Sequence, residues 1–452
     1  MLLKAVQRKV GATMTSLIVG ASLAFTGAAP ASAQRIALIS DAETENMLRE
    51  YTDPILRAAG LESSAVKLHL VNDQSLNAFV AAGQQMFFNT GLITTVDTPS
   101  ELIGVIAHET GHMAGGHLVK RREEMEGLSV PMLASMILGV GAIAAGAGDA
   151  GMAVIMGSQH LATRSLLAFT REQEASADQA GATYLQRSGM SGRGMLDLFA
   201  TMRDQELLTE NRQDPYARSH PMSGARLSAL EARVKESPYY DRRDSPERLH
   251  QFKMVQAKLH GFLDDPNATF NRYPESDNST YARYARGVAY HRTGRLDKAM
   301  SEIEPLLEME PSNPYIREVQ GQIYFESGKV EEAISSYRQA LALLPDEQFH
   351  LGLGRALLAR GDKASSEEAV KHLQAASSSG NQPYAFYQLS IAYGQLDNIG
   401  MAQLATAQYY DALGAVKEAK MHATRAQKLL TNGSPEWLRA QDILVQPNPQ
   451  RG

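Results

Sequence analysis

Cysteine is the residue that this chain lacks altogether, because none occurs among its 452 residues. Disulfide bonds are therefore excluded, and so is a lipid attached through cysteine. Any metal ion must instead be held by histidine, aspartate or glutamate. An excess of positive charge is also missing, since the formal net charge at pH 7 is -6. This balance argues against nucleic acid as a partner.

The first residues have the pattern of an export signal. Three basic residues precede an apolar run over residues 17–25, and Ala31-Ser32-Ala33 follows as the small-x-small pattern that signal peptidase cleaves. We therefore expect residues 1–33 to be a signal peptide that is cleaved on export. Removing the three basic residues takes the formal charge from -6 to -9. A retained membrane anchor is the alternative, although a span needs about 20 apolar residues.

The composition of the sequence changes between residues 245 and 275, which are rich in proline, aspartate and asparagine. The mature chain of about 420 residues exceeds what one hydrophobic core usually organises. We expect a catalytic domain over residues 34–260 and a repeat domain over residues 275–440.

A period of 34 residues characterises the second domain. Five residues recur at this one offset, since Gly287, Tyr290, Gly294, Ala299 and Pro311 return as Gly321, Tyr324, Gly328, Ala333 and Pro345. This is the period of tetratricopeptide repeats, whose units are pairs of helices. Looser units extend the pattern to Leu430, so we expect four or five units in all. Such a solenoid presents a concave face to a partner protein, or it caps a neighbouring domain.

A metal-binding motif lies in the first domain. Residues 99–126 have the apolar spacing of one helix, and within it stands His108-Glu109-Thr110-Gly111-His112. Two histidines four residues apart project from one face of a helix, where both imidazoles reach one zinc ion. Glu109 is then placed to take a proton from water at the zinc without binding the metal itself. The alternative is a pair of histidines packed in a core.

A catalytic zinc ion needs a third protein ligand, because it keeps three ligands and one open position. His117 is one residue out of register for the layout that uses a third histidine, so we interpret it as a surface or helix-end residue. Glu174 is the better candidate, because it shares with Asp178 one face of a second helix predicted from Ser165 to Arg187. One carboxylate would bind zinc, and the other would accept the N–H of a ligating imidazole. From spacing alone, an acidic pair on a solvated face is the default interpretation.

At these residues the sequence resembles the HtpX-type gluzincin metallopeptidases, and most closely a periplasmic branch that combines protease and chaperone functions with a repeat domain. The shared segments are residues 41–45, 77–79, 89–93, 108–112, 174–178 and 219–221. Ser176 stands where the family has a second glutamate, a departure that leaves Glu174 and Asp178 in place. The resemblance implies a mainly α chain, in which an α+β zincin-type metallopeptidase domain with a small sheet precedes an α-solenoid of tetratricopeptide repeats.

The resemblance also implies roles that spacing does not show. His220 matches a histidine that occupies the fourth zinc position and keeps the enzyme inactive until it moves away, and we also consider a part in stabilising the transition state. From the sequence alone, a structural histidine is the alternative. Arg226 matches an arginine that braces the site. Asn77 and Ala78 match the substrate-binding region, where an ordinary turn asparagine is the alternative.

Strand patterns precede the metal-binding motif. Val66, Leu68 and Leu70 alternate with polar residues, and Met86-Phe87-Phe88 indicates a second strand. An edge strand beside the zinc would hold an extended peptide through backbone hydrogen bonds, which give affinity with little sequence preference.

Residues 128–156 are almost wholly apolar and small, and a glycine-containing break over residues 146–151 divides them. Each half is too short to span a bilayer comfortably. We consider a helical hairpin packed in the protein and, as the alternative, a peripheral contact with a membrane surface or an outer-membrane protein.

Two functions follow from these observations. The first is a zinc metalloendopeptidase with one zinc ion per chain. For it, the resemblance implies unfolded or misassembled outer-membrane β-barrel proteins as substrates and the β-barrel assembly machinery as a partner of the repeats. The second is a chaperone or scaffold that works through its repeats while its protease activity is latent.

Overall fold

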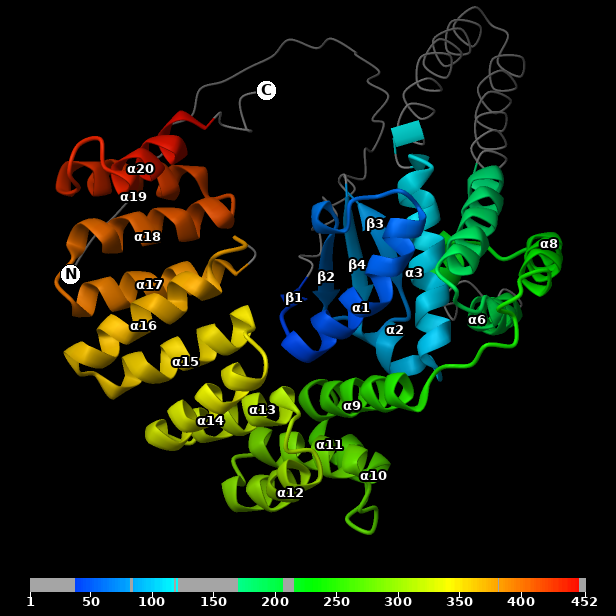
Figure 1. Cartoon of the computed structure of the whole chain (residues 1–452), viewed down its shortest axis with the longest axis horizontal. Coiled ribbons are helices and arrows are strands. Elements are labelled where there is room, and N and C mark those ends of the chain that lie inside the picture. Colours follow the sequence, from blue (N-terminus) through cyan, green and yellow to red (C-terminus); the bar gives the residue numbers. More distant parts are fainter. Residues whose placement is uncertain are drawn as a thin grey trace, which may run out of the picture. The chain divides into compact units, whose positions relative to one another are not determined.

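The computed structural model describes residues 37–81, 84–117, 119–120, 170–205, 215–380 and 382–446 (Figure 1). The expected signal peptide and the apolar segment 128–156 lie outside these described residues. Within the described ranges, no helix is both long enough and apolar enough to cross a membrane. The expected mainly α chain with one small sheet is confirmed.

The sheet has four strands, in the order β1-β2-β4-β3. They are β1 (Leu38–Ile39), β2 (Lys67–Val71), β3 (Ala78–Ala81) and β4 (Gln85–Asn89). The two strands predicted from the sequence are β2 and β4, which run parallel in the centre, and Leu70 of β2 lies opposite Phe88 of β4. Both side chains are buried, as alternation predicts for one face of a sheet. Among the residues that the structure describes, strand β3 pairs only with β4, which makes it an edge strand.

Helices α1 (Ala42–Ala58) and α3 (Pro99–Ala114) supply much of the core that packs on this sheet. Met47, Tyr51 and Ile55 recur at helical spacing along α1 and are fully buried. Among its described residues, this part also contains the helices α2 (Thr90–Thr95), α6 (Arg193–Gln205), α7 (Pro215–Ser219) and α8 (Gly224–Lys235). Residues 170–187 are also helical and end at Gly189, whose φ of 68° is left-handed, so the second predicted helix is confirmed over its described part.

Helix α3 is shorter than the sequence pattern indicates. We predicted one helix over residues 99–126, but α3 ends at Ala114 and a turn at Gly115 and Gly116 follows. Gly116 has a φ of 62°, which L side chains rarely adopt and which breaks a right-handed helix. The prediction was wrong because the apolar spacing continues past the glycines and hides the break.

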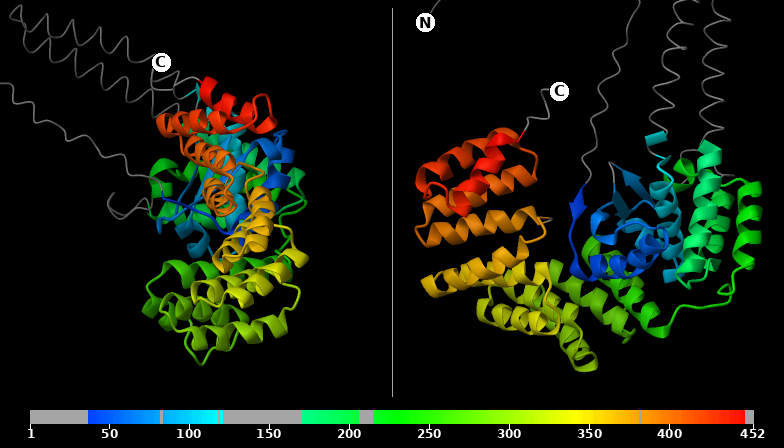
Figure 2. Two further views of the ribbon diagram at one scale, coloured as in Figure 1. Left: turned by 90° about the vertical axis from the view of Figure 1, so that its left-hand side faces the viewer. Right: turned by 45° about the horizontal axis from the view of Figure 1, so that its top comes forward.

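Paired helices form the second half of the chain. After α9 (Pro246–Leu263) and α10 (Pro266–Arg272) come five hairpins, which Figure 2 shows stacked in sequence order. Their helices are α11 (Thr280–Arg292), α12 (Leu296–Met309), α13 (Pro314–Glu326), α14 (Val330–Leu343), α15 (Glu347–Arg360), α16 (Lys363–Ala376), α17 (Pro383–Gln395), α18 (Ile399–Ala412), α19 (Val416–Leu429) and α20 (Pro435–Val445). Gly294 and Gly328, two of the recurring residues, have positive φ at the turns within the first two hairpins. Only glycine adopts positive φ without strain, so these tight turns explain why glycine recurs at both positions.

A buried ionic cluster joins α1 to the repeats. Lys258 of α9 is 1% exposed, and its Nζ lies 2.5 Å from Asp41, 3.5 Å from Glu318 of α13 and 3.6 Å from Glu43. The hydroxyl of Tyr284, from α11, donates to Glu43 at 2.9 Å. Burial raises the pKa of Glu43 to about 7, although Lys258 opposes this shift. The first part of the chain and the repeats therefore share a polar core.

Candidate metal centre

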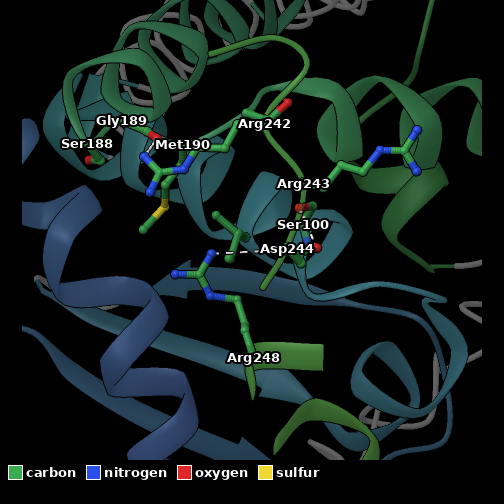
Figure 3. A pocket seen from close by; sticks show the side chains of 10 residues that line it. Ser100, Ser188, Gly189, Met190, Arg242, Arg243, Asp244 and Arg248 are labelled. Carbon is green, nitrogen blue, oxygen red and sulfur yellow. Dashed lines mark hydrogen bonds and ion pairs between the residues drawn. The ribbon is translucent and has the colours of Figure 1, made fainter. Parts of the chain in front are cut away.

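The start of α3 is held firmly, which fixes the helix that carries the metal-binding motif. Thr98 caps the helix by accepting from the amide of Glu101, and Pro99 occupies its first turn. Asp244 accepts from the amide and the hydroxyl of Ser100, at 3.1 and 2.6 Å. Figure 3 shows this carboxylate beside Ser100, with the guanidinium of Arg248 directed toward it at 3.5 Å.

Two glycines allow the helix over residues 170–187 to approach α3 closely. A Cβ atom on Gly111 would lie 2.7 Å from the carbonyl oxygen of Ala177, and one on Gly181 would lie 3.1 Å from the backbone of Ala107. The two helices therefore meet backbone to backbone at these points. This contact brings the carboxylate of Glu174 against the two histidines of α3.

Four side chains converge at this contact. Nε2 of His108 lies 3.0 Å from Nε2 of His112 and 3.3 Å from Glu174, and His112 Nε2 lies 3.3 Å from the other oxygen of Glu174. His220, which directly follows α7, places its Nδ1 3.0 Å from Glu174 and 3.2 Å from His108 Nε2. One ligand atom from each of these residues lies within 4.8 Å of the others. His108, His112 and Glu174 are buried.

This donor set fits a zinc ion. Nitrogen and oxygen ligands at about 2.05 Å from zinc, placed at the corners of a tetrahedron, are about 3.3 Å apart. The distances of 3.0 to 3.3 Å between the four side chains match that spacing. Histidine nitrogen and carboxylate oxygen are the ligand types that a chain without cysteine can offer.

Glu109 lies next to the four donors and not among them. It is 1% exposed, and its carboxylate lies 3.5 Å from Nε2 of His220. Tyr216 is fully buried and packs against His220, with ring centroids 4.5 Å apart and ring planes tilted by 30°. Burial and the carboxylate of Glu109 raise the pKa of the Tyr216 phenol. Tyr216 was not predicted from the sequence, although its position four residues before His220, on the same face of a helical turn, was the available signal.

Asp178 and Arg226 brace the donors from behind. Asp178 lies 2.9 Å from Nδ1 of His108, on the side of the ring that faces away from the cluster. Arg226 donates to both oxygens of Asp178, at 2.8 and 2.9 Å, and its third nitrogen lies 3.2 Å from Glu174. Burial acts to raise the pKa of Asp178, but the contacts with His108 and Arg226 lower it. Asp178 is therefore ionised and suited to accept the N–H of His108.

The pKa of Glu174 is lowered in the same way. Burial alone would raise it, but contacts with His108, His112 and His220 bring it well below its usual range. Glu174 thus offers an ionised carboxylate to the cluster at neutral pH.

His117 lies just beyond the end of α3, as one of our two interpretations has it, but it does not lie at the surface. It is 5% exposed, and its ring packs against His112 on the side away from the four donors. The reason is the turn at Gly115 and Gly116, which interrupts the helix predicted to be continuous and lets the His117 ring pack on Gly115.

Asn77 and Ala78 lie at the start of the edge strand β3. Ala78 is buried, and Asn77 has a buried side-chain oxygen with no hydrogen-bond partner in the described part of the chain. The carbonyl of Leu76, one residue earlier, accepts from the amide of Tyr216 at 3.3 Å. The strand therefore begins next to the short helix that leads to His220.

Comparison with known proteins gives two families. The sequence model of Peptidase family M48 matches residues 42–234, and that of the tetratricopeptide repeat matches residues 284–348 and 318–381. These matches confirm the expected combination of a metallopeptidase domain and tetratricopeptide repeats.

Named relatives are proteases. The chain is 28% identical over 250 residues to the beta-barrel assembly-enhancing protease of Yersinia pestis, a match that covers 54% of this chain and 51% of that protein. The protein of the same name from Escherichia coli K12 is 25% identical over 251 residues, covering 54% and 50% of the two chains. Metalloprotease LoiP of that organism is 30% identical over 173 residues, covering 37% and 62%. The matched part spans about half the length of the first two relatives.

Proposed function

Since the chain carries a family M48 peptidase domain followed by tetratricopeptide repeats, we propose that it is a zinc-dependent metalloendopeptidase. The observation that carries this proposal is the set of four converging side chains next to the buried Glu109. We assign the peptidase domain to residues 34–260, the repeat domain to residues 275–440 and a cleaved signal peptide to residues 1–33. The mature chain then works in the periplasm.

His108, His112 and Glu174 would hold the single zinc ion. When bound, zinc supplies Lewis acidity toward a water molecule and toward the carbonyl of the scissile peptide. Glu109 takes a proton from the attacking water and passes it to the leaving amine. Asp178 and Arg226 keep His108 and Glu174 in their orientations during this cycle.

His220 acts as a gate. Its Nδ1 lies among the donors at 3.0 Å from Glu174, in the place that water and substrate need, and its other nitrogen faces Glu109. Cleavage therefore requires His220 to move aside. Its neighbour Tyr216 links this movement to the start of β3 through the amide that bonds to Leu76. After the movement, His220 is close enough to help stabilise the transition state.

The substrate is an extended polypeptide that adds to the edge strand β3, where Asn77 and Ala78 begin the binding region. Two relatives are named as enhancing β-barrel assembly. On that basis, the substrates of this chain are unfolded or misassembled outer-membrane proteins, and its repeats dock to the β-barrel assembly machinery. Residues 128–156 would add peripheral contact with the membrane.

A second function is a chaperone or scaffold that works through the repeats while the protease is silent. The specific observation in its favour is His220, which stands among the proposed zinc ligands and opposes activity at rest.

The test compares purified residues 34–452 as wild type, Glu109→Gln and His220→Ala, each with its zinc content determined. Degradation of an unfolded outer-membrane protein is followed by electrophoresis. We expect one zinc per chain, cleavage by the wild type, none by Glu109→Gln and faster cleavage by His220→Ala. Zinc binding without cleavage by any of the three proteins would favour the scaffold, and absence of zinc would refute the ligand assignment.

A further inference from the structure

The turn after α3 places a histidine behind a proposed zinc ligand. Gly116 has a φ of 62°, so α3 does not continue through it, and the described residues 117 and 119–120 are helical again. A Cβ atom on Gly115 would lie 2.4 Å from Nε2 of His117, which means that the His117 ring packs directly on the bare backbone of Gly115. The two glycines therefore serve to fold this imidazole inward.

The ring of His117 contacts the outer nitrogen of His112. The two Nδ1 atoms are 3.0 Å apart, and the ring planes are nearly perpendicular, at 81°. His112 directs its Nε2 toward His108 and Glu174, so its Nδ1 is the nitrogen left for a supporting contact. Two imidazole nitrogens at this distance need one donor and one acceptor.

His117 is itself held in place by the helix that carries Glu174. The side-chain amide of Gln173 donates to the carbonyl of His117 at 3.1 Å, and both residues are buried. The two proposed ligand histidines are thus supported alike: Nδ1 of His108 faces Asp178, and Nδ1 of His112 faces His117. A carboxylate supports one ring, and an imidazole supports the other.

We propose that His117 is a positioning residue of the metal centre, whose Nδ1 accepts the N–H of His112. This contact selects the tautomer of His112 that leaves Nε2 free for the metal, and it fixes the angle of the ring. The inference rests on the proposed zinc centre, but not on any assigned substrate. His117 is not itself a ligand, because it lies on the far side of His112 from the other donors.

The test uses the mature chain with His117→Phe, which keeps a ring but has no acceptor, and His117→Gln, which offers an acceptor oxygen. His260→Phe is the matched control, because His260 is equally buried on α9 and makes its contact with Asp264 instead. Zinc affinity is measured by competition with a chelator. The tautomer of His112 is read from nitrogen-15 spectra of the histidine-labelled, zinc-loaded protein, and circular dichroism checks the fold.

We expect His117→Phe to lose about 10- to 100-fold in zinc affinity, the usual effect of removing such a supporting contact. His117→Gln should recover most of this loss and retain the protonated Nδ1 of His112, and His260→Phe should bind zinc like the wild type. Equal zinc affinity in wild type and His117→Phe would overturn the proposal. Equal losses in the Phe and Gln variants would also overturn it, because packing and not acceptance would then be the cause. Since no readout involves proteolysis, a chain that binds zinc but cleaves nothing still tests it.

Discussion

Glu43 offers a sharp test of the buried cluster that joins α1 to the repeats. One cation, Lys258, faces three carboxylates there, those of Asp41, Glu43 and Glu318. Burial raises the pKa of Glu43 from 4.5 to about 7, and the side chain is only 2% exposed. We therefore predict that Glu43→Gln stabilises the protein at pH 8, because glutamine resembles the protonated acid in shape and carries no charge.

The magnitude follows from linkage. The pKa of Glu43 is higher in the folded chain than in the unfolded chain, so folding favours the protonated form. Its contribution to stability is complete below pH 4.5 and is lost as the pH rises through 7. A difference of about 2.5 pKa units corresponds to about 3 kcal/mol. Glu43→Gln should therefore raise the free energy of unfolding by about 3 kcal/mol at pH 8 and have little effect near pH 4.5.

Urea unfolding followed by circular dichroism, at several pH values between 4.5 and 8, measures this difference. Glu308→Gln is the control, because Glu308 is exposed on α12 and its substitution should change stability little at any pH. A Glu43→Gln protein less stable than the wild type at pH 8 would contradict the raised pKa of Glu43. A stability difference that did not depend on pH would contradict it as well.

Three further outcomes are expected. Lys258→Met leaves the buried carboxylates without the cation of Lys258 and should lower the free energy of unfolding by about 3 to 5 kcal/mol in the same urea assay at pH 8. An unchanged midpoint of urea unfolding would contradict the buried ionic cluster. Asp178→Asn removes the charge that pairs with Arg226 and supports His108, so chelator competition should show about 10- to 100-fold weaker zinc binding. An unchanged zinc affinity would contradict the bracing role of Asp178. Gly111→Ala introduces a methyl group 2.7 Å from the carbonyl oxygen of Ala177, so it should destabilise the chain by about 1 to 3 kcal/mol and weaken zinc binding. Full stability of this variant would show that α3 and the helix over residues 170–187 are not in close contact.

The features that the sequence predicts are those set by residues close together in the chain. His108 and His112 share a helical face wherever that helix lies, and Glu174 and Asp178 do the same on the second helix. The 34-residue period likewise records short-range packing within and between neighbouring hairpins. These features depend on residues that are close in sequence, so pattern alone was enough to find them.

Long-range contacts explain what the sequence did not show. Nothing in the spacing of Asp41, Lys258 and Glu318 indicates that they meet, because only the packing of α1, α9 and α13 brings them together. The burial of His117 was not predicted, for a different reason. Apolar periodicity favoured one long helix, although the pair Gly115-Gly116 was a visible signal of its end.

The glycine contacts between α3 and the helix over residues 170–187 have a consequence for divergence and for engineering. Because the backbones touch at Gly111 and Gly181, the spacing between His108 and Glu174 depends little on the volumes of nearby core side chains. We expect such a core to tolerate exchange of leucine for methionine or valine while the proposed metal centre keeps its dimensions. A search for remote relatives, or a transplant of this centre into a new scaffold, should therefore retain the two glycines together with the histidines and the glutamate.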